Sequence, residues 1–215
     1  MIVVCGLSSM TACVRESSLP PTLVPAPPLP TAGRVFDLTR SVVGTGLLEG
    51  PRTTRAWSPT GDERDPGRLI GPAVIIDLPS GEVDAVVRVE QLLAWESVHG
   101  PITSGSWVVA RSLHVEDSGD ESSPSHHPGW SVEAVRFLIR ERSISGVGID
   151  APAIDPGIAG EPMAREALRA GRRWAIESLT GLDALPSHGA TLVVAPLPVS
   201  DRAMAPASVL AVVPR

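Results

Sequence analysis

The side chains that could hold a metal or move a proton gather in the second half of this 215-residue chain. Three histidines, His114, His126 and His127, stand in a segment rich in aspartate and glutamate. Their spacing differs from His-Glu-x-x-His, which places two ligands on one helix face. They are candidate ligands for a loosely held metal ion, and a solvated acidic loop is the alternative.

Glu177 ends a short apolar run that begins at Trp174. One interpretation makes it a metal ligand, or a general base whose pKa burial raises. The other makes it a structural carboxylate that a nearby cation neutralises, and Arg172 and Arg173 are the candidates. We favour the structural interpretation.

No other catalytic motif is apparent in the sequence. The serines lack the Gly-x-Ser-x-Gly pattern of a nucleophile elbow, and both cysteines lie in the first thirteen residues. No Gly-x-x-x-x-Gly-Lys or Gly-x-Gly-x-x-Gly loop is present to bind phosphate. Nucleophilic and nucleotide-dependent mechanisms are therefore not indicated.

The elements that must position these side chains alternate between strand and helix, which predicts an α/β fold with a mixed central sheet and flanking helices. The run at 72–78 is bounded by glycine and proline and predicts a central strand, whereas 44–68 lacks periodicity and predicts a loop. Expected strands are 35–39, 72–78, 106–113, 147–150, 174–177, 191–195 and 208–213. Expected helices are 89–98, with Val89, Leu92, Leu93 and Val98 on its apolar face, 131–142 with Ser131 as its cap, and one from Pro162 to Gly171.

Composition predicts one globular domain over residues 34–215, because 43% of the chain is hydrophobic. The net charge is −6 and basic residues form no cluster longer than a pair, so nucleic acid is not an expected partner. No run reaches the roughly 18–20 apolar residues that a membrane-spanning helix needs.

The N-terminal segment suggests processing. Met10-Thr11-Ala12-Cys13 is similar to a bacterial lipobox, with Cys13 as the lipidation site, although no basic residue precedes it. Residues 1–16 would then be a truncated signal segment, and 17–33, with six prolines, an extended tether. The expected location is extracytoplasmic, with a lipid anchor in the membrane. An ordinary terminus on a cytoplasmic protein is the alternative.

Three segments together resemble one known family. Leu69–Leu78, Gly148–Gly157 and Glu177–Pro186 are similar to blocks of the metal-dependent cyclase family, which includes kynurenine formamidase (arylformamidase) and isatin hydrolase. The resemblance implies a swivelling β/β/α fold, self-association into a homo-oligomer, and a divalent metal that polarises an amide carbonyl and activates water.

The ligands that the resemblance implies are mostly missing. The family motif His-x-Gly-Thr-His-x-Asp-x-Pro is absent, and no histidine precedes His99. A further family histidine aligns with Ala164, while Arg165 matches its neighbour. The Glu of a Glu-Asn-Leu block is kept as Glu177, and its Asn is replaced by Ser178.

The resemblance also implies a pocket for a flat aromatic molecule. Asp150 and Asp155 would shape the loop at its mouth, and Trp107 and Trp130 are candidate lining residues. The alternatives are turn-forming aspartates and core tryptophans.

Two functions follow from these observations. The first is a degenerate member of the family, not metal-catalytic, that keeps the fold and a pocket for a small aromatic molecule. The second is an active arylformamidase-like amide hydrolase whose metal site is rebuilt with zinc or manganese around Glu177, His114, His126 and His127. Loss of nearly all the ligands favours the first.

Overall fold

The computed structural model describes residues 33–40, 53–58, 66–112, 126–197 and 204–215. Cys13, nearly all of the proline-rich tether and His114 lie outside these ranges, so their assigned roles stay predictions. Among the described residues, no helix is both long and apolar enough to span a membrane.

The described elements alternate as the sequence predicts. They are β1 (Gly33–Asp37), β2 (Arg55–Trp57), β3 (Ile70–Asp77), β4 (Val86–Val87), α1 (Val89–His99), β5 (Trp107–Arg111), β6 (Gly129–Trp130), α2 (Val132–Arg142), β7 (Gly146–Ile149), α3 (Met163–Ala170), β8 (Trp174–Glu177), β9 (Ala190–Pro196) and β10 (Met204–Pro214), with short 3-10 turns at Pro66–Arg68 (η1) and Leu182–Ala184 (η2).

Seven strands close into a barrel-like mixed sheet. Their order is β10-β2-β8-β7-β5-β3-β9, and pairing of β9 with β10 closes the circuit. The 11-residue strand β10 also pairs with β1, which lies outside the closed part. The mixed α/β sheet and the central place of β3, between β5 and β9, are confirmed.

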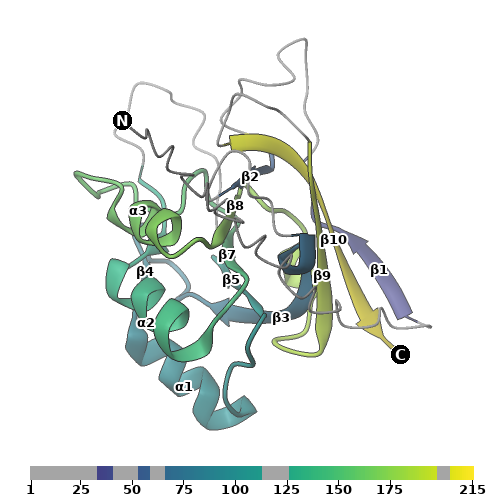
Figure 1. Ribbon diagram of the computed structural model, residues 1–215. Helices are drawn as coiled ribbons and strands as arrows, with labels where there is room; N and C mark the ends of the chain where they lie inside the picture. Colours follow the sequence, from purple (N-terminus) through teal and green to yellow (C-terminus); the bar gives the residue numbers. More distant parts are fainter. Residues whose placement is uncertain (1–32, 41–52, 59–65, 113–125, 198–203) are drawn as a thin grey trace, which may run out of the picture.

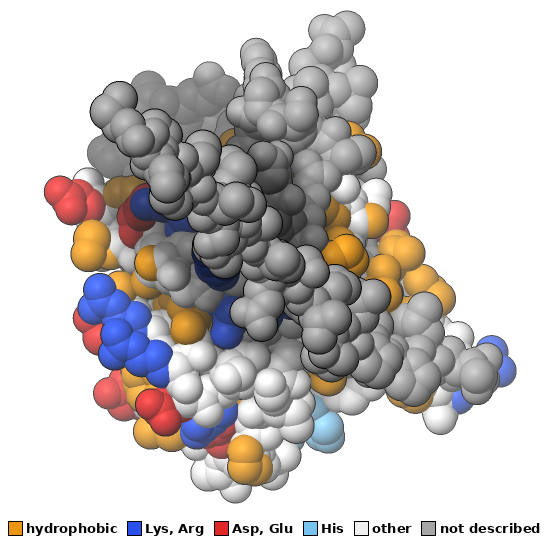
Figure 2. All heavy atoms as spheres, in the orientation of Figure 1, with side chains coloured by type: hydrophobic (Ala, Val, Ile, Leu, Met, Phe, Trp, Pro, Cys, Tyr) orange, Lys and Arg blue, Asp and Glu red, His pale blue; other side chains and the backbone are white. Residues whose placement is uncertain are grey.

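Four neighbouring strands, β3, β5, β7 and β8, run parallel, so the chain must cross over between them. The crossovers contain α1, α2 and α3, which form one layer on one side of the sheet (Figure 1). Basic and acidic side chains are interspersed over this layer on the face drawn in Figure 2.

The four parallel strands bury both of their faces, and the buried residues form two hydrophobic clusters. In β3, Val74 and Ile76 join the cluster beneath the helices, whereas Ala73 and Ile75 join residues from strands all round the closed sheet. Successive side chains of a strand point to opposite faces. The near-continuous apolar run at 72–78 therefore fills two cores at once.

Two expectations about local structure were wrong. The segment predicted as loop contains β2, whose three residues are too few for any periodicity to show. The helix at α1 is present, but Leu93 and Val98, expected on its apolar face, are 49% and 75% exposed, and only Leu92 is buried. Ser131 does cap α2, because its hydroxyl accepts a hydrogen bond from Ala134 N.

We predict that Gly146→Ala destabilises the sheet. A Cβ at this position in β7 would lie 2.5 Å from Trp174 O and 2.6 Å from the Trp107 ring. Overpacking of this kind costs about 1–3 kcal/mol, and a backbone oxygen has little freedom to move away. Urea unfolding measures the loss. Gly160→Ala is the control, because nothing lies within 4 Å of its Cβ, and an equal loss in both variants would contradict the packing described.

Candidate functional site

Charged side chains meet at the edge of the sheet where the parallel strands end. Asp77 ends β3, Arg111 ends β5, Asp150 follows β7 and Glu177 ends β8. The carboxyl ends of parallel strands are where α/β sheets bind their ligands. This edge is therefore the place to look for a site.

Glu177 is the central charge of this edge, and its side chain is completely buried. Its Oε1 accepts hydrogen bonds from Arg165 Nη2 at 3.0 Å and from the backbone N–H of Ile154 at 3.1 Å. Its Oε2 accepts one from Arg55 Nη2 at 3.3 Å. Both carboxylate oxygens are thus occupied by cationic or backbone donors.

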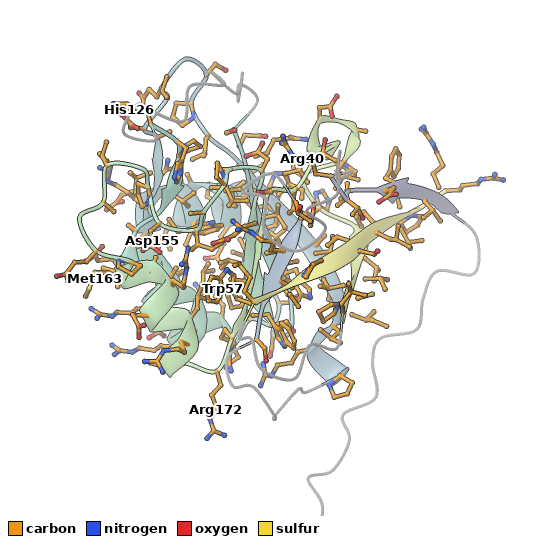
Figure 3. The ribbon with its side chains drawn as sticks, turned by 90° about the horizontal axis from the view of Figure 1, so that it is seen from above. Arg40, Trp57, His126, Asp155, Met163 and Arg172 are labelled. Carbon is orange, nitrogen blue, oxygen red and sulfur yellow. The ribbon has the colours of Figure 1, made fainter. Side chains whose placement is uncertain are left out.

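The fold brings the two arginines to Glu177 by different routes. The register of β2 and β8 places Arg55 directly opposite Glu177, and the same Nη2 also donates to Pro152 O at 3.0 Å. Arg165 comes from the first turn of α3 and stacks on Trp57, with 4.4 Å from its guanidinium carbon to the ring centroid. Figure 3 shows where Trp57 lies relative to Asp155.

The predicted cation partners of Glu177 were wrong. Arg172 and Arg173 precede β8, and a strand rises about 3.3 Å per residue, so they stand more than about 10 Å from its far end. Arg173 instead donates to the carbonyls of Gly171 and Arg172. Arg172 points away from Trp57 and Asp155 in Figure 3.

Asp155 holds the start of α3. Its Oδ1 accepts from Ala164 N at 2.7 Å and its Oδ2 from Arg165 N at 3.3 Å. These are amides of the first turn, which lack partners within a helix. Burial raises the pKa of Asp155, and these two hydrogen bonds oppose the rise. The carboxylate therefore fixes the residue that reaches Glu177.

Asp150 is the second carboxylate of the edge. Its Oδ2 accepts from Ser112 N at 2.9 Å, whereas its Oδ1 is enclosed with no hydrogen-bond partner among the described residues. Burial raises the pKa of Asp150; the hydrogen bonds of Ser112 and the charge of Arg40 partly offset the rise. A protonated Asp150 is consequently favoured at a higher pH than for an ordinary aspartate.

Trp107 and Trp130, the candidate pocket residues, have fully buried side chains. The Trp107 indole donates to Arg68 O at 3.0 Å, and the Trp130 indole donates to Gly148 O at 3.2 Å. Each belongs to one of the two hydrophobic clusters, with its polar atom satisfied by backbone. Their contacts are those of core residues.

The two described candidate histidines lie apart from Glu177. His126 Nδ1 is 2.7 Å from Asp84 Oδ2, and Figure 3 places His126 at the margin of the molecule. His127 is buried, with its Nδ1 3.0 Å from Pro128 O. Within the described ranges, no three His, Cys, Asp or Glu side chains converge as a metal site would require.

The arrangement at Glu177 does not fit the divalent metal that the family resemblance implies. Its carboxylate already carries two guanidinium contacts, and Ala164, which the family resemblance aligns with a histidine, is buried and has no donor atom. A divalent cation would meet two fixed positive charges in a buried, weakly screened place. Glu177, Arg55 and Arg165 form an ion cluster.

Arg55 and Trp57 belong to the candidate site, and the sequence interpretation missed both of them. Both belong to β2, inside the segment predicted as loop, and no pattern in the sequence marks them. Arg165 had one signal: it follows directly after Ala164 at the start of the predicted helix. Its contact with Glu177 still depends on the crossover between β7 and β8.

Comparison with known proteins identifies similar chains. A sequence profile of the family described as putative cyclase matches residues 28–156. A protein named isatin hydrolase from Roseibium aggregatum is 33% identical over 168 residues, 72% of this chain and 64% of that protein. The match thus spans less than two thirds of the length of that relative.

Solved structures agree with the sequence matches. Isatin hydrolase A from Labrenzia aggregata, bound to benzyl benzoate, has a TM-score of 0.74 at 25% identity, covering 85% of this chain and 94% of that one. An isatin hydrolase bound to the product analogue thioisatinate has a TM-score of 0.66 at 27% identity, covering 93% of this chain and 87% of that one.

We predict that Glu177→Gln lowers the free energy of unfolding by about 3 kcal/mol or more, because it leaves two partly buried guanidinium groups without their counter-charge. Chemical denaturation measures the loss. Glu166→Gln is the control, since it breaks an exposed pair with Arg169 and should change stability little. Equal effects of the two substitutions would contradict a buried ion cluster.

We predict that the stability of Asp150→Asn relative to the wild type rises with pH. The folded-state pKa of Asp150 is raised, so ionising it opposes folding as pH climbs from its ordinary value of 3.8 through the raised value. The variant lacks this penalty. Urea unfolding at several pH values between 3.5 and 7 gives the difference.

Glu96→Gln serves as the control, because its stability relative to the wild type should change with pH in the opposite direction. Hydrogen bonds from Arg142 lower the pKa of Glu96, so its stabilising contribution is present above its ordinary value of 4.5 and lost as pH falls through the lowered one. The deficit of this variant should therefore grow with pH. A pH-independent difference for Asp150→Asn would mean that its carboxyl is not destabilised by burial.

Proposed function

This chain belongs to the cyclase family and has its metal-dependent hydrolase fold, and we propose that it is a degenerate member in which an arginine cluster replaces the metal. The observation that carries the proposal is the burial of Glu177 together with its contacts to two arginines. This carboxylate, which the family resemblance makes a metal ligand, is fully buried and bonded on both oxygens to Arg55 and Arg165.

The counter-charge that the buried Glu177 needs is the physical reason that favours this proposal over metal-dependent hydrolysis. A buried carboxylate needs a counter-charge, and a metal ion or a guanidinium group can supply it. Arg165 is fixed from two directions, by the hydrogen bond that its backbone N–H donates to Asp155 Oδ2 and by stacking on Trp57. Displacing its side chain to admit a metal would lose the stacking on Trp57, and the metal would be repelled by the guanidinium group of Arg55.

We further propose that the chain binds a small aromatic molecule at the carboxyl edge. Support comes from the relatives solved with benzyl benzoate and thioisatinate. Trp57 is the half-buried aromatic residue beside the ion cluster, and its indole Nε1 has no hydrogen-bond partner in the described part of the chain. Asp150 and Asp155 would flank such a ligand.

The second candidate is an active arylformamidase-like amide hydrolase with a rebuilt site. The observation in its favour is Asp150, a carboxyl group at the same edge with one enclosed, unpartnered oxygen and a raised pKa. Such a group is a candidate for proton transfer. Its metal would be zinc or manganese.

Three further proposals concern assembly and location. The closed sheet and its helical layer would form the swivelling β/β/α fold, and the chain would associate into a homo-oligomer. Lipidation at Cys13 would anchor it to a membrane, which fractionation of cells that express wild type and Cys13→Ser tests. A soluble, unmodified Cys13 would rule out the anchor.

We predict that the full chain, grown with manganese and zinc, carries no metal that depends on Glu177. Mass spectrometry of purified wild type and Glu177→Gln should give equal metal contents. Isatin and an N-formyl aromatic amine should show no turnover at high protein concentration. Chelator-sensitive turnover, together with stoichiometric metal that Glu177→Gln loses, would instead establish the hydrolase.

We predict that Trp57→Leu weakens binding of an aromatic probe such as isatin at least tenfold, because the substitution removes the aromatic surface beside the ion cluster. Saturation-transfer NMR measures binding. Trp95→Leu, on α1, is the matched control and should leave binding unchanged. Equal binding by wild type and both variants would place any aromatic ligand elsewhere.

A further inference from the structure

Three rings meet on the surface, away from the carboxyl edge. His99 is the last residue of α1, and His188 lies in the turn that precedes β9. Their ring centroids are 4.8 Å apart, and the Trp95 ring is 4.6 Å from His99 and 6.5 Å from His188. Figure 1 shows the end of α1 and the start of β9 in the lower part of the molecule.

Both imidazoles are available to an external ligand. His99 and His188 are exposed, and neither ring makes a hydrogen bond or ion pair with any residue that the structure describes. Two different elements hold them together, because α1 packs on β3 and the turn of His188 is fixed by the hydrogen bond from Ile75 N to Ser187 O at 2.9 Å. The pair is therefore set by tertiary structure.

Their geometry suits shared coordination of one ion. Ligand nitrogens lie about 2.0–2.1 Å from zinc, so two of them on one ion are about 3 Å apart. With centroids 4.8 Å apart, rotation of the rings about their side-chain torsions can bring one nitrogen of each to that separation. The C-terminal end of α1 also carries the negative pole of the helix dipole, which favours a cation.

We propose that His99 and His188 form a surface site for a borderline divalent transition ion, such as Ni²⁺, Cu²⁺ or Zn²⁺, with water completing the coordination. Neutral imidazole prefers these ions to Mn²⁺ or Mg²⁺, which prefer oxygen. The site is separate from Glu177 and does not depend on the function proposed above. Trp95 packs against the ligand rings and reports on their occupancy.

Titration of the full chain with Ni²⁺ by calorimetry tests the proposal. Wild type should bind one ion that His99→Gln and His188→Gln each weaken at least tenfold. His126→Gln and the wild type should share one affinity. Because both histidines are exposed, unchanged thermal unfolding of the variants without Ni²⁺ checks that they remain folded.

Fluorescence supplies a second readout. Ni²⁺ should quench part of the tryptophan emission of the wild type, and Trp95→Phe should lose that part while it keeps the calorimetric affinity. Absence of binding at millimolar Ni²⁺ would overturn the proposal. So would binding that His126→Gln abolishes and His99→Gln does not.

Discussion

Neutralising the buried carboxylate of Glu177 is the constraint on which the edge of this molecule depends. An ionised carboxylate out of water is costly unless it is paired and hydrogen-bonded. Here Arg55, Arg165 and the Ile154 amide supply those contacts. The same bonds tie together β2, β8, α3 and the loop after β7, so one charge connects the distant strand β2 to three segments of the second half of the chain.

The closed sheet makes this convergence possible. Parallel pairing of β5, β7 and β8 brings their ends to one edge, and the antiparallel strand β2 supplies a cation opposite the end of β8. Asp155 then sets the start of α3 and, with it, the place of Arg165. At this edge the chain places two positive side chains on one carboxylate. We propose that they take the place of a metal ion there.

Periodicity and breakers in the sequence identify most of the scaffold. The runs at 72–78 and 174–177 are strands, and Ser131 caps its helix, because burial and capping leave local signals. The ion cluster around Glu177 leaves no such local signal in the sequence. Arg55 reaches Glu177 through a three-residue strand, and Arg165 through a crossover, so the nearby Arg172 and Arg173 looked like better partners. The apolar face of α1 was also misjudged, since Leu93 and Val98 are exposed.

A crystal structure of the full chain grown with manganese, with anomalous data collected at the manganese edge, would show whether arginines or a metal ion neutralise Glu177. We expect the guanidinium groups of Arg55 and Arg165 within hydrogen-bond distance of Glu177 and no anomalous peak at its carboxylate. A manganese peak at bonding distance from Glu177, with the arginines turned away, would contradict it.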